Sequence, residues 1–303
     1  MDLGLQDVHV LVTGANGGIG LEITNVFLQQ GAKVTAHYNS SDKSLEPLIA
    51  QYKDRAQAFQ ADLTIETAVS HLFDYASSSF GPVQIIIVNH GVWPPVYEPV
   101  VEMSLEQWKS TIDINLTSSF IVCREYLKGL QRASNDIKDY ASILFIGSSS
   151  GKFGEAGHAD YSASKSVTAL MYGLTLTLKN EIVKIAPKGR VNCVAPGWVK
   201  TPMVADALDD PDVVYRAMAT TPLKKVGVTS DIARQVVVLS SPLISGHVSG
   251  EVIMVTGGME GDSYHDYQKK LRVILIFYKV VCLIFPKTCY KPQLSIAGWF
   301  HAT

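Results

Sequence analysis

Two side chains near the middle of the sequence have the types and the spacing to handle a proton. Tyr161 and Lys165 are four residues apart, so on a helix they share one face. A phenol has a pKa of about 10, and an ammonium held beside it favours the phenolate and lowers that pKa. The spacing therefore predicts a tyrosine that can serve as a general acid or base. A helical tyrosine followed by a solvated lysine has the same spacing, so the pair alone does not identify a site.

A serine and a glycine-rich loop support the first interpretation. Ser148 follows the apolar run 143–146, where the end of a strand could aim its hydroxyl at a substrate oxygen. Far upstream, a β-branched run at 8–12 is followed by Gly14, Gly18 and Gly20 and then by a helical apolar pattern. A strand, a glycine loop and a helix together form the usual site for a dinucleotide pyrophosphate, because backbone N–H groups and the helix dipole favour the anion. The spacing differs from the common Gly-x-Gly-x-x-Gly fingerprint, and a glycine-rich turn by itself could be only a tight loop.

With these residues in place, the chain resembles the short-chain dehydrogenase/reductase family over about residues 8–258. The resemblance implies an NAD(P)-dependent oxidoreductase that interconverts a carbonyl and an alcohol on a small molecule. It also implies the roles of the catalytic residues: Tyr161 exchanges the proton, Ser148 hydrogen-bonds the substrate oxygen, and Lys165 lowers the tyrosine pKa and holds the nicotinamide ribose. Asn115 would complete the set through a water relay. Asparagine is a poor residue inside a helix, and a local break there would expose a carbonyl that can hold water.

Alternating strand and helix patterns predict an α/β fold. We expect a Rossmann-type, doubly wound parallel sheet of about seven strands with helices on both faces, in a single domain at residues 1–258. The strands are expected at 8–12, 33–37, 56–60, 84–88, 142–146, 190–194 and 251–255, and the main helical patterns near 41–53, 64–79, 104–131, 161–185 and 230–239.

The end of the second strand should select the cofactor. In this fold an acidic residue there hydrogen-bonds the ribose 2′-hydroxyl of NAD, whereas here Tyr38, Asn39 and Ser40 leave room and donors for a 2′-phosphate, with Lys43 as an extra charge. We therefore expect NADP(H) to be favoured over NAD(H), although the same residues could form an ordinary polar turn. The resemblance implies the following cofactor contacts: Gly14, Asn16, Gly18, Ile19, Gly20, Tyr38, Asn39, Ser40, Asp62, Leu63, Asn89, Gly91, Tyr161, Lys165, Pro196, Gly197, Val199 and Thr201.

Several of these positions have a second interpretation. Asp62 could contact the adenine or cap the helix that begins near residue 64. His90 stands where the family usually has a small residue, and a lone histidine is more often structural than catalytic. Trp93 begins a stiff loop that we interpret as a pocket wall or a partner-facing surface. Residues 202–225 show mixed periodicity and are expected to form a substrate lid.

Composition limits the partners. The net charge of −2 gives no electrostatic case for nucleic acid or an anionic membrane. The four cysteines have no metal-ligand spacing and the N-terminus shows no secretory signal, so no metal site and a reducing, cytoplasmic compartment are expected. By resemblance we expect a homodimer or homotetramer that packs through the helices at 104–131 and 161–185.

Two questions stay open at this stage. Residues 259–303 extend past the region of resemblance, and their apolar segment 271–285 is shorter than the roughly 20 residues of a membrane span. This extension could be a membrane-surface or anchoring helix, a cover over a partner subunit, or a segment without an evolved role. For the whole chain, a catalytically silent cofactor-binding regulator is the alternative to an enzyme, and epimerisation or dehydration is a further one. The sequence names no substrate.

Overall fold

A single parallel sheet forms the centre of the computed structural model, which describes residues 2–259 and, at 167 and 168, the backbone alone. Its strand order is β3-β2-β1-β4-β5-β6-β7. The strands are β1 (His9–Val12), β2 (Lys33–Tyr38), β3 (Ala56–Gln60), β4 (Ile85–Val88), β5 (Ser142–Ile146), β6 (Arg190–Pro196) and β7 (Val252–Val255). This confirms the predicted doubly wound fold. The order reverses between β1 and β4, and such a point leaves a crevice at the carboxyl ends of the strands.

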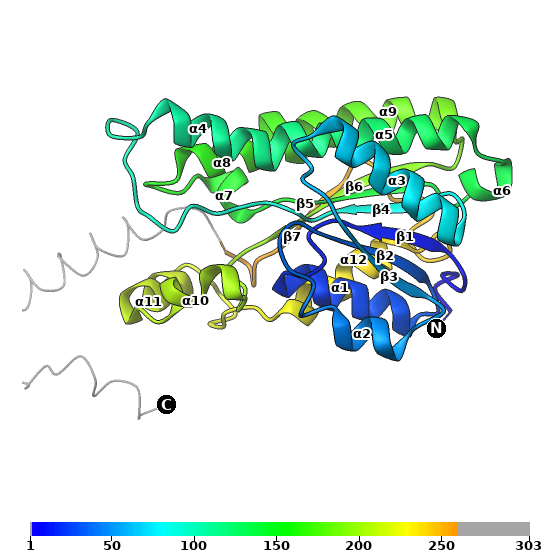
Figure 1. Ribbon diagram of the computed structural model, residues 1–303. Coiled ribbons are helices and arrows are strands. Elements are labelled where there is room, and N and C mark those ends of the chain that lie inside the picture. The colour runs from blue at the N-terminus through cyan, green and yellow to red at the C-terminus, as the bar shows by residue number, and fades with distance from the viewer. Residues whose placement is uncertain (1, 260–303) are drawn as a thin grey trace, which may run out of the picture. The chain divides into compact units, whose positions relative to one another are not determined.

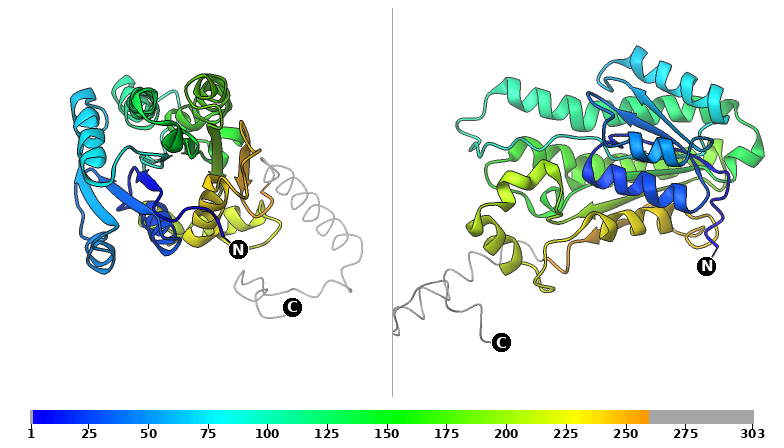
Figure 2. Two further views of the ribbon diagram at one scale, coloured as in Figure 1. Left: turned by 90° about the vertical axis from the view of Figure 1, so that its right-hand side faces the viewer. Right: turned by 60° about the horizontal axis from the view of Figure 1, so that its bottom comes forward.

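Helices cover both faces of the sheet (Figure 1). On one face α3 (Glu66–Phe80) packs on α5 (Ser118–Arg132), and α5 packs on α9 (Thr175–Ile185). On the other face α1 (Gly18–Gln29) packs on α12 (Thr229–Ser240), with α2 (Glu46–Gln51) beside α1 (Figure 2). The central strands are therefore enclosed on both sides, which explains why β4 is an unbroken buried run of Ile85, Ile86, Ile87 and Val88 rather than an alternating one.

The two long helical patterns are each interrupted. The stretch 104–131 consists of α4 (Leu105–Ile112), the π-helix η1 (Asp113–Thr117) and α5. The stretch 161–185 consists of α8 (Ala159–Lys165), the π-helix η2 (Val167–Leu174) and α9, with Ser166 in an extended conformation between the first two. Residues 202–225, which showed mixed periodicity, contain η3 (Pro202–Val204), α10 (Ala205–Leu208) and α11 (Pro211–Ala219). Short helices of this kind are held by tertiary contacts and leave little periodic signal. The remaining helices are α6 (Asn135–Lys138) and α7 (Ser149–Phe153).

The C-terminal extension predicted at 259–303, with its apolar segment 271–285, lies outside the described residues from 260 onward. Among the residues that the structure does describe, no helix combines the length and the apolar character needed to cross a membrane.

A buried cation fixes the end of α12. The side chain of Arg190, at the start of β6, is enclosed and donates to the carbonyl oxygens of Leu239 (2.6 Å), Ser240 (2.8 Å) and Ser245 (3.1 Å). Carbonyls at a helix C-terminus have no partner inside the helix, and a cation there also meets the negative end of the helix dipole. Arg190 therefore fastens α12, and through it α1, to the sheet.

Replacing Arg190 with Met should lower the free energy of unfolding by about 3 kcal/mol, because the substitution leaves buried carbonyls without a donor. Urea denaturation followed by circular dichroism would measure the change. Arg132→Met, at the exposed C-terminus of α5, is the matched control and should cost no more than about 0.5 kcal/mol. Equal unfolding free energies for the two variants would contradict the role of Arg190 in fastening α12 to the sheet.

Candidate active site

A cavity of about 680 Å³ opens at the carboxyl ends of the strands, around the point where the strand order reverses. Most of the residues predicted for the site line it: Gly14, Asn16, Gly18, Ile19, Gly20, Asn39, Asp62, Leu63, Asn89, Gly91, Ser148, Tyr161, Lys165, Pro196, Gly197, Val199 and Thr201. Tyr38, Ser40 and Asn115 are not among the lining residues. The volume lies within the range of small-molecule and cofactor sites.

The glycine loop forms one wall of this cavity. Helix α1 begins at Gly18 with Gly17 as its N-cap, and no side chain caps it, so backbone N–H groups of its first turn remain available to a ligand. A Cβ at Gly20 would lie 2.2 Å from the Gly14 carbonyl oxygen and 2.6 Å from Asn89 Nδ2. Any side chain at Gly20 would therefore push the loop apart. An uncapped helix start behind such a tight loop fits the pyrophosphate of a dinucleotide.

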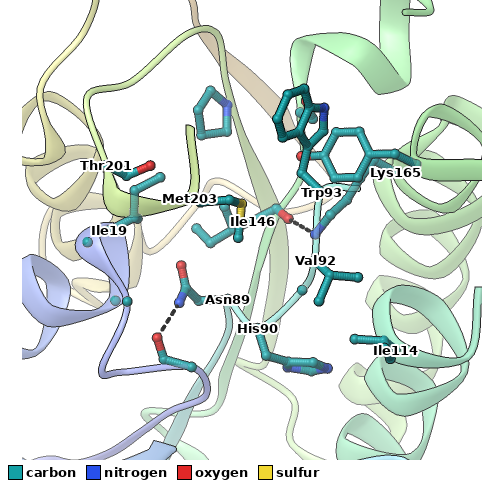
Figure 3. A pocket seen from close by; sticks show the side chains of 18 of the residues that line it. Ile19, Asn89, His90, Val92, Trp93, Ile114, Ile146, Lys165, Thr201 and Met203 are labelled. Atoms are coloured by element: carbon teal, nitrogen blue, oxygen red, sulfur yellow. Dashed lines mark hydrogen bonds between the residues drawn. The ribbon is translucent and has the colours of Figure 1, made fainter. Parts of the chain in front are cut away.

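Asn89 joins the glycine loop to the next strand. Its Nδ2 donates to the carbonyl oxygens of Thr13 and Gly14, each at 3.0 Å, and its backbone N–H donates to Thr13 Oγ1 at 2.9 Å (Figure 3). These bonds hold the ends of β1 and β4 at a fixed separation at the floor of the cavity.

His37, on β2, was not predicted as a site residue and lines the cavity. Its Nδ1 accepts the Gly14 N–H at 3.1 Å, so the ring proton is on Nε2, which donates to the Ala61 carbonyl at 2.9 Å. Burial lowers the pKa of His37 to about 4, which keeps this acceptor neutral and available. The available signal was a histidine near the carboxyl end of a strand that leads into the predicted cofactor loop.

His90 is bonded through both ring nitrogens, as a structural residue would be, although it also lines the cavity. Its Nδ1 lies 2.8 Å from Thr13 Oγ1, and its Nε2 lies 2.7 Å from Ser118 Oγ. Ser118 donates its own proton to the Ile114 carbonyl, so its oxygen accepts the Nε2–H of His90. The single proton of Thr13 Oγ1 has two acceptors within reach, His90 Nδ1 and the Ile87 carbonyl at 3.1 Å. Burial lowers the pKa of His90 well below its usual value. A neutral ring therefore connects the end of β1 to the start of α5.

The proton-handling residues meet at the opposite wall. Burial raises the pKa of Tyr161 to about 12, the hydrogen bond with Ser148 opposes that rise, and the Glu155 carboxylate adds to it. Lys165 is itself enclosed: burial lowers its pKa to about 8, and its Nζ donates to the Ile146 carbonyl at 3.0 Å (Figure 3). The predicted lowering of the tyrosine pKa by the lysine is therefore not what the structure shows. Loss of water around the phenol is the main cause of its raised pKa, and the ammonium of Lys165 is directed at a backbone oxygen.

Asn115 lies behind the cavity wall. The helix does depart from α-geometry there, as η1, but the Asn115 carbonyl accepts the Ser119 hydroxyl at 2.7 Å and so already has a partner. The side chain pairs with the backbone of Val92, accepting from its N–H (2.8 Å) and donating to its carbonyl (3.0 Å), and also donates to Ser164 Oγ (3.0 Å). In this arrangement Asn115 fixes the loop that carries Val92 and Trp93.

The helix-cap interpretation of Asp62 is wrong. Helix α3 starts at Glu66 with Ile65 at its N-cap, and the Asp62 carboxylate instead accepts the backbone N–H (2.9 Å) and the hydroxyl (2.7 Å) of Thr64. Asp62 closes a local turn that precedes the helix, and its side chain remains at the cavity edge. Within residues 2–259, no three His, Cys, Asp or Glu side chains come together as a metal site.

Comparison with known proteins agrees with this geometry. The family model described as enoyl-(acyl carrier protein) reductase matches residues 14–260. The chain is 32% identical over 259 residues to 3beta-hydroxysteroid dehydrogenase 1 of Eggerthella lenta, covering 84% of this chain and 94% of that protein. It is 30% identical over 258 residues to a 3-oxoacyl-[acyl-carrier-protein] reductase of Vibrio cholerae, covering 85% and 99%.

A solved structure has the same fold. A short-chain dehydrogenase/reductase of the glucose/ribitol dehydrogenase type from Brucella melitensis superimposes with a TM-score of 0.73 at 30% identity, covering 86% of this chain and 99% of that one.

The neutral state of His37 should make stability depend on pH. The unfolded chain protonates this histidine below its ordinary pKa of 6.5, whereas the folded chain does so only near 4, so lowering the pH through that window destabilises the fold. His37→Gln should therefore remove about 2 kcal/mol from the difference in unfolding free energy between about pH 7 and about pH 5. Urea titrations at both pH values measure it. His71→Gln, exposed on α3, should keep the wild-type difference, and an unaltered difference in His37→Gln would contradict the assignment.

Proposed function

Because this chain belongs to the short-chain dehydrogenase/reductase family, we propose that its strand-end cavity interconverts a carbonyl and an alcohol with the help of a nicotinamide cofactor. One observation carries the proposal: Tyr161, hydrogen-bonded with Ser148, lines the same cavity as the uncapped start of α1. A proton donor for the substrate oxygen and a binding site for a dinucleotide thus share one enclosed space.

The cofactor would be held at the glycine loop. Gly18, Ile19 and Gly20 offer backbone N–H groups for the pyrophosphate, and Asp62 and Leu63 line the part of the cavity beyond β3. Pro196, Gly197, Val199 and Thr201 form the wall after β6, against which the nicotinamide would lie. When bound, the nicotinamide supplies or accepts the hydride, and the protein contributes position and electrostatics.

Tyr161 would control the proton. Because its pKa is raised to about 12, it carries its proton at neutral pH and can donate it to a carbonyl oxygen as that oxygen gains negative charge. The Ser148 hydroxyl, which lines the cavity, would donate a hydrogen bond to the same oxygen. In the direction of oxidation Tyr161 has to accept a proton, which needs the phenolate.

Lys165 and Asn115 would support this exchange. Lys165 lines the cavity and could exchange its bond to the Ile146 carbonyl for the ribose hydroxyls of the cofactor, which would bring its charge into the bound complex. Asn115 bonds Val92 in the loop after β4 and Ser164 in α8, between Tyr161 and Lys165, so its role here is to position that loop and helix α8. We also propose that a water relay reaches Lys165 by way of Asn115.

A catalytically silent, cofactor-binding regulator is the alternative. Such a protein would have no need of a buried phenol beside a serine and an ammonium, since burying these groups costs free energy. The presence of Asn115, Ser148, Tyr161 and Lys165 together favours the enzyme.

Further parts of the proposal concern the setting of the site. We propose that the catalytic domain ends near Gly258, that copies associate into a homodimer or homotetramer, and that the chain works in a reducing, cytoplasmic compartment. The buried free thiols Cys123 and Cys193 suit such a compartment, and the exposed apolar side chains Phe120, Leu176 and Val183 on α5 and α9 suit a helix-to-helix association.

Tyr161→Phe should lower turnover by about 10³-fold on the first ketone that the wild-type protein reduces, because it removes the proton donor. Binding of the reduced cofactor, followed by nicotinamide fluorescence, should stay close to wild type. Tyr75→Phe, on the exposed face of α3, is the matched control and should retain turnover. Wild-type turnover by Tyr161→Phe would overturn the mechanism.

The end of β2 should favour NADPH over NADH by about tenfold in affinity, because Asn39 offers a donor rather than a charge that repels the 2′-phosphate. Asn39→Asp, which has nearly the same shape, should reverse this order in a fluorescence titration by weakening NADPH alone. Asn135→Asp, exposed at the start of α6, should change neither affinity. A wild-type preference for NADH would overturn the cofactor assignment, and absence of binding by both would overturn the proposed function.

A further inference from the structure

The end of the cavity beyond Tyr161 has aromatic walls. Trp93 and Trp198 both line it, with ring centroids 6.3 Å apart and an interplanar angle of 76°. Behind Trp93 lies the ring of His158, at 4.6 Å between centroids. Figure 3 shows Trp93 on the same side of the cavity as Lys165, across from Ile19 and Thr201 of the glycine-loop side. Val92 and Met203 complete an apolar lining. These walls fit the apolar faces of a ring or a short carbon chain.

A single carboxylate stands among these walls. Glu155 follows α7 and lines the cavity, where its Oε1 accepts Trp93 Nε1–H at 3.2 Å and its Oε2 accepts the Ser150 hydroxyl at 2.7 Å. Glu155 is close enough to Tyr161 for its charge to contribute to the raised pKa of the phenol. An ionised carboxylate has about four acceptor sites, so these two bonds orient Glu155 and leave capacity for a further donor.

Among the described residues no lysine or arginine pairs with Glu155, and the group beside it that could carry a positive charge is His158, whose Nε2 lies 4.0 Å from Oε1 and is charged only when protonated. Among the described residues that line the cavity, Lys165 is the one Lys or Arg, and its Nζ is bonded to the Ile146 carbonyl. The acidic side chains Asp62 and Asp113 line other parts of the same cavity. A substrate with a carboxylate or phosphate beside its reacting carbon would therefore meet the like charge of Glu155 with no lysine or arginine beside it.

We infer that Glu155 determines the substrate class of this site: neutral alcohols and ketones that carry a second hydroxyl next to the reacting carbon, with an apolar face for Trp93 and Trp198. The second hydroxyl donates to the free acceptor sites of Glu155 while the reacting oxygen faces Tyr161 and Ser148. Substrates with a carboxylate at that position are excluded. The inference rests on the proposed function for its chemistry, but it also predicts binding without turnover.

The test compares four ring compounds: cyclohexanol, trans-1,2-cyclohexanediol, trans-2-aminocyclohexanol and trans-2-hydroxycyclohexanecarboxylate. Wild-type protein with its preferred cofactor should oxidise the diol with a kcat/KM about tenfold above cyclohexanol and at least tenfold above the carboxylate. In Glu155→Gln the amide oxygen can still accept the Trp93 Nε1–H and the amide nitrogen can hydrogen-bond Ser150 Oγ, but the negative charge is lost. Measured relative to cyclohexanol in the same variant, it should raise kcat/KM for the carboxylate about tenfold and lower it for the diol. Glu102→Gln, exposed in the loop before α4, is the matched control and should match wild type.

A binding readout separates this inference from the proposed function. Quenching of tryptophan fluorescence should show tighter binding of the diol than of the carboxylate, and Trp93→Phe should reduce the signal. If none of the four compounds is oxidised but the diol still binds better and Glu155→Gln removes that difference, the proposed function fails and the inference stands. Equal use of diol and carboxylate by wild type, or an unchanged preference in Glu155→Gln, overturns the inference. The same holds if the aminoalcohol, which carries an ammonium, is preferred over the diol more than tenfold, since Glu155 would then select a cation.

Discussion

The hydrogen bonds across the gap between the ends of β1 and β4 are the constraint on which the rest of the site depends. Where the strand order reverses, the segments that follow the two neighbouring strands lead away from each other. Here the Asn89 amide and the Thr13 hydroxyl join the ends of β1 and β4 across the gap between those segments. The glycine loop leaves one side of this joint and the loop with His90 and Trp93 leaves the other. Cofactor wall and substrate wall therefore share one anchor, and a displacement of either changes the separation between them.

Burial rather than charge sets the chemistry of the proton donor. An ammonium near a phenol should favour the phenolate, yet Tyr161 has a pKa of about 12 because its surroundings exclude water and include the Glu155 carboxylate. The same burial brings the pKa of Lys165 down to about 8. Both shifts favour uncharged groups, so a charge that forms on a substrate oxygen is met by hydrogen bonds, from Ser148 and the phenol, more than by a neighbouring ion.

Sequence patterns predicted the strands and helices, whose signal is local in the chain. They failed for residues whose role depends on a contact with a residue distant in sequence. The strands at 56–60 and 142–146 came out with their predicted bounds. At 142–146 an apolar, partly β-branched run carries that signal locally, whereas 56–60 has no β-branched residue and follows from its place between two helical patterns. The cap alternative for Asp62 was wrong because a local turn and a helix cap use the same side chain. His37 and Glu155 were missed because their importance comes from the Gly14 N–H and from Trp93, residues 23 and 62 positions away.

The distribution of charge explains why the glycine loop has so little freedom. A dinucleotide carries negative charge, but Lys165 is the one Lys or Arg lining the described cavity, and it lies at the substrate end with Tyr161. The N–H groups at the uncapped start of α1 must therefore supply the attraction that side-chain cations supply elsewhere. Such dipoles act only at close range and in a fixed orientation. The His37 bond to Gly14 and the absence of space for a side chain at Gly20 both preserve that orientation. In the proposed site, cofactor binding would therefore depend on backbone geometry, whereas substrate choice would depend on the charge of Glu155.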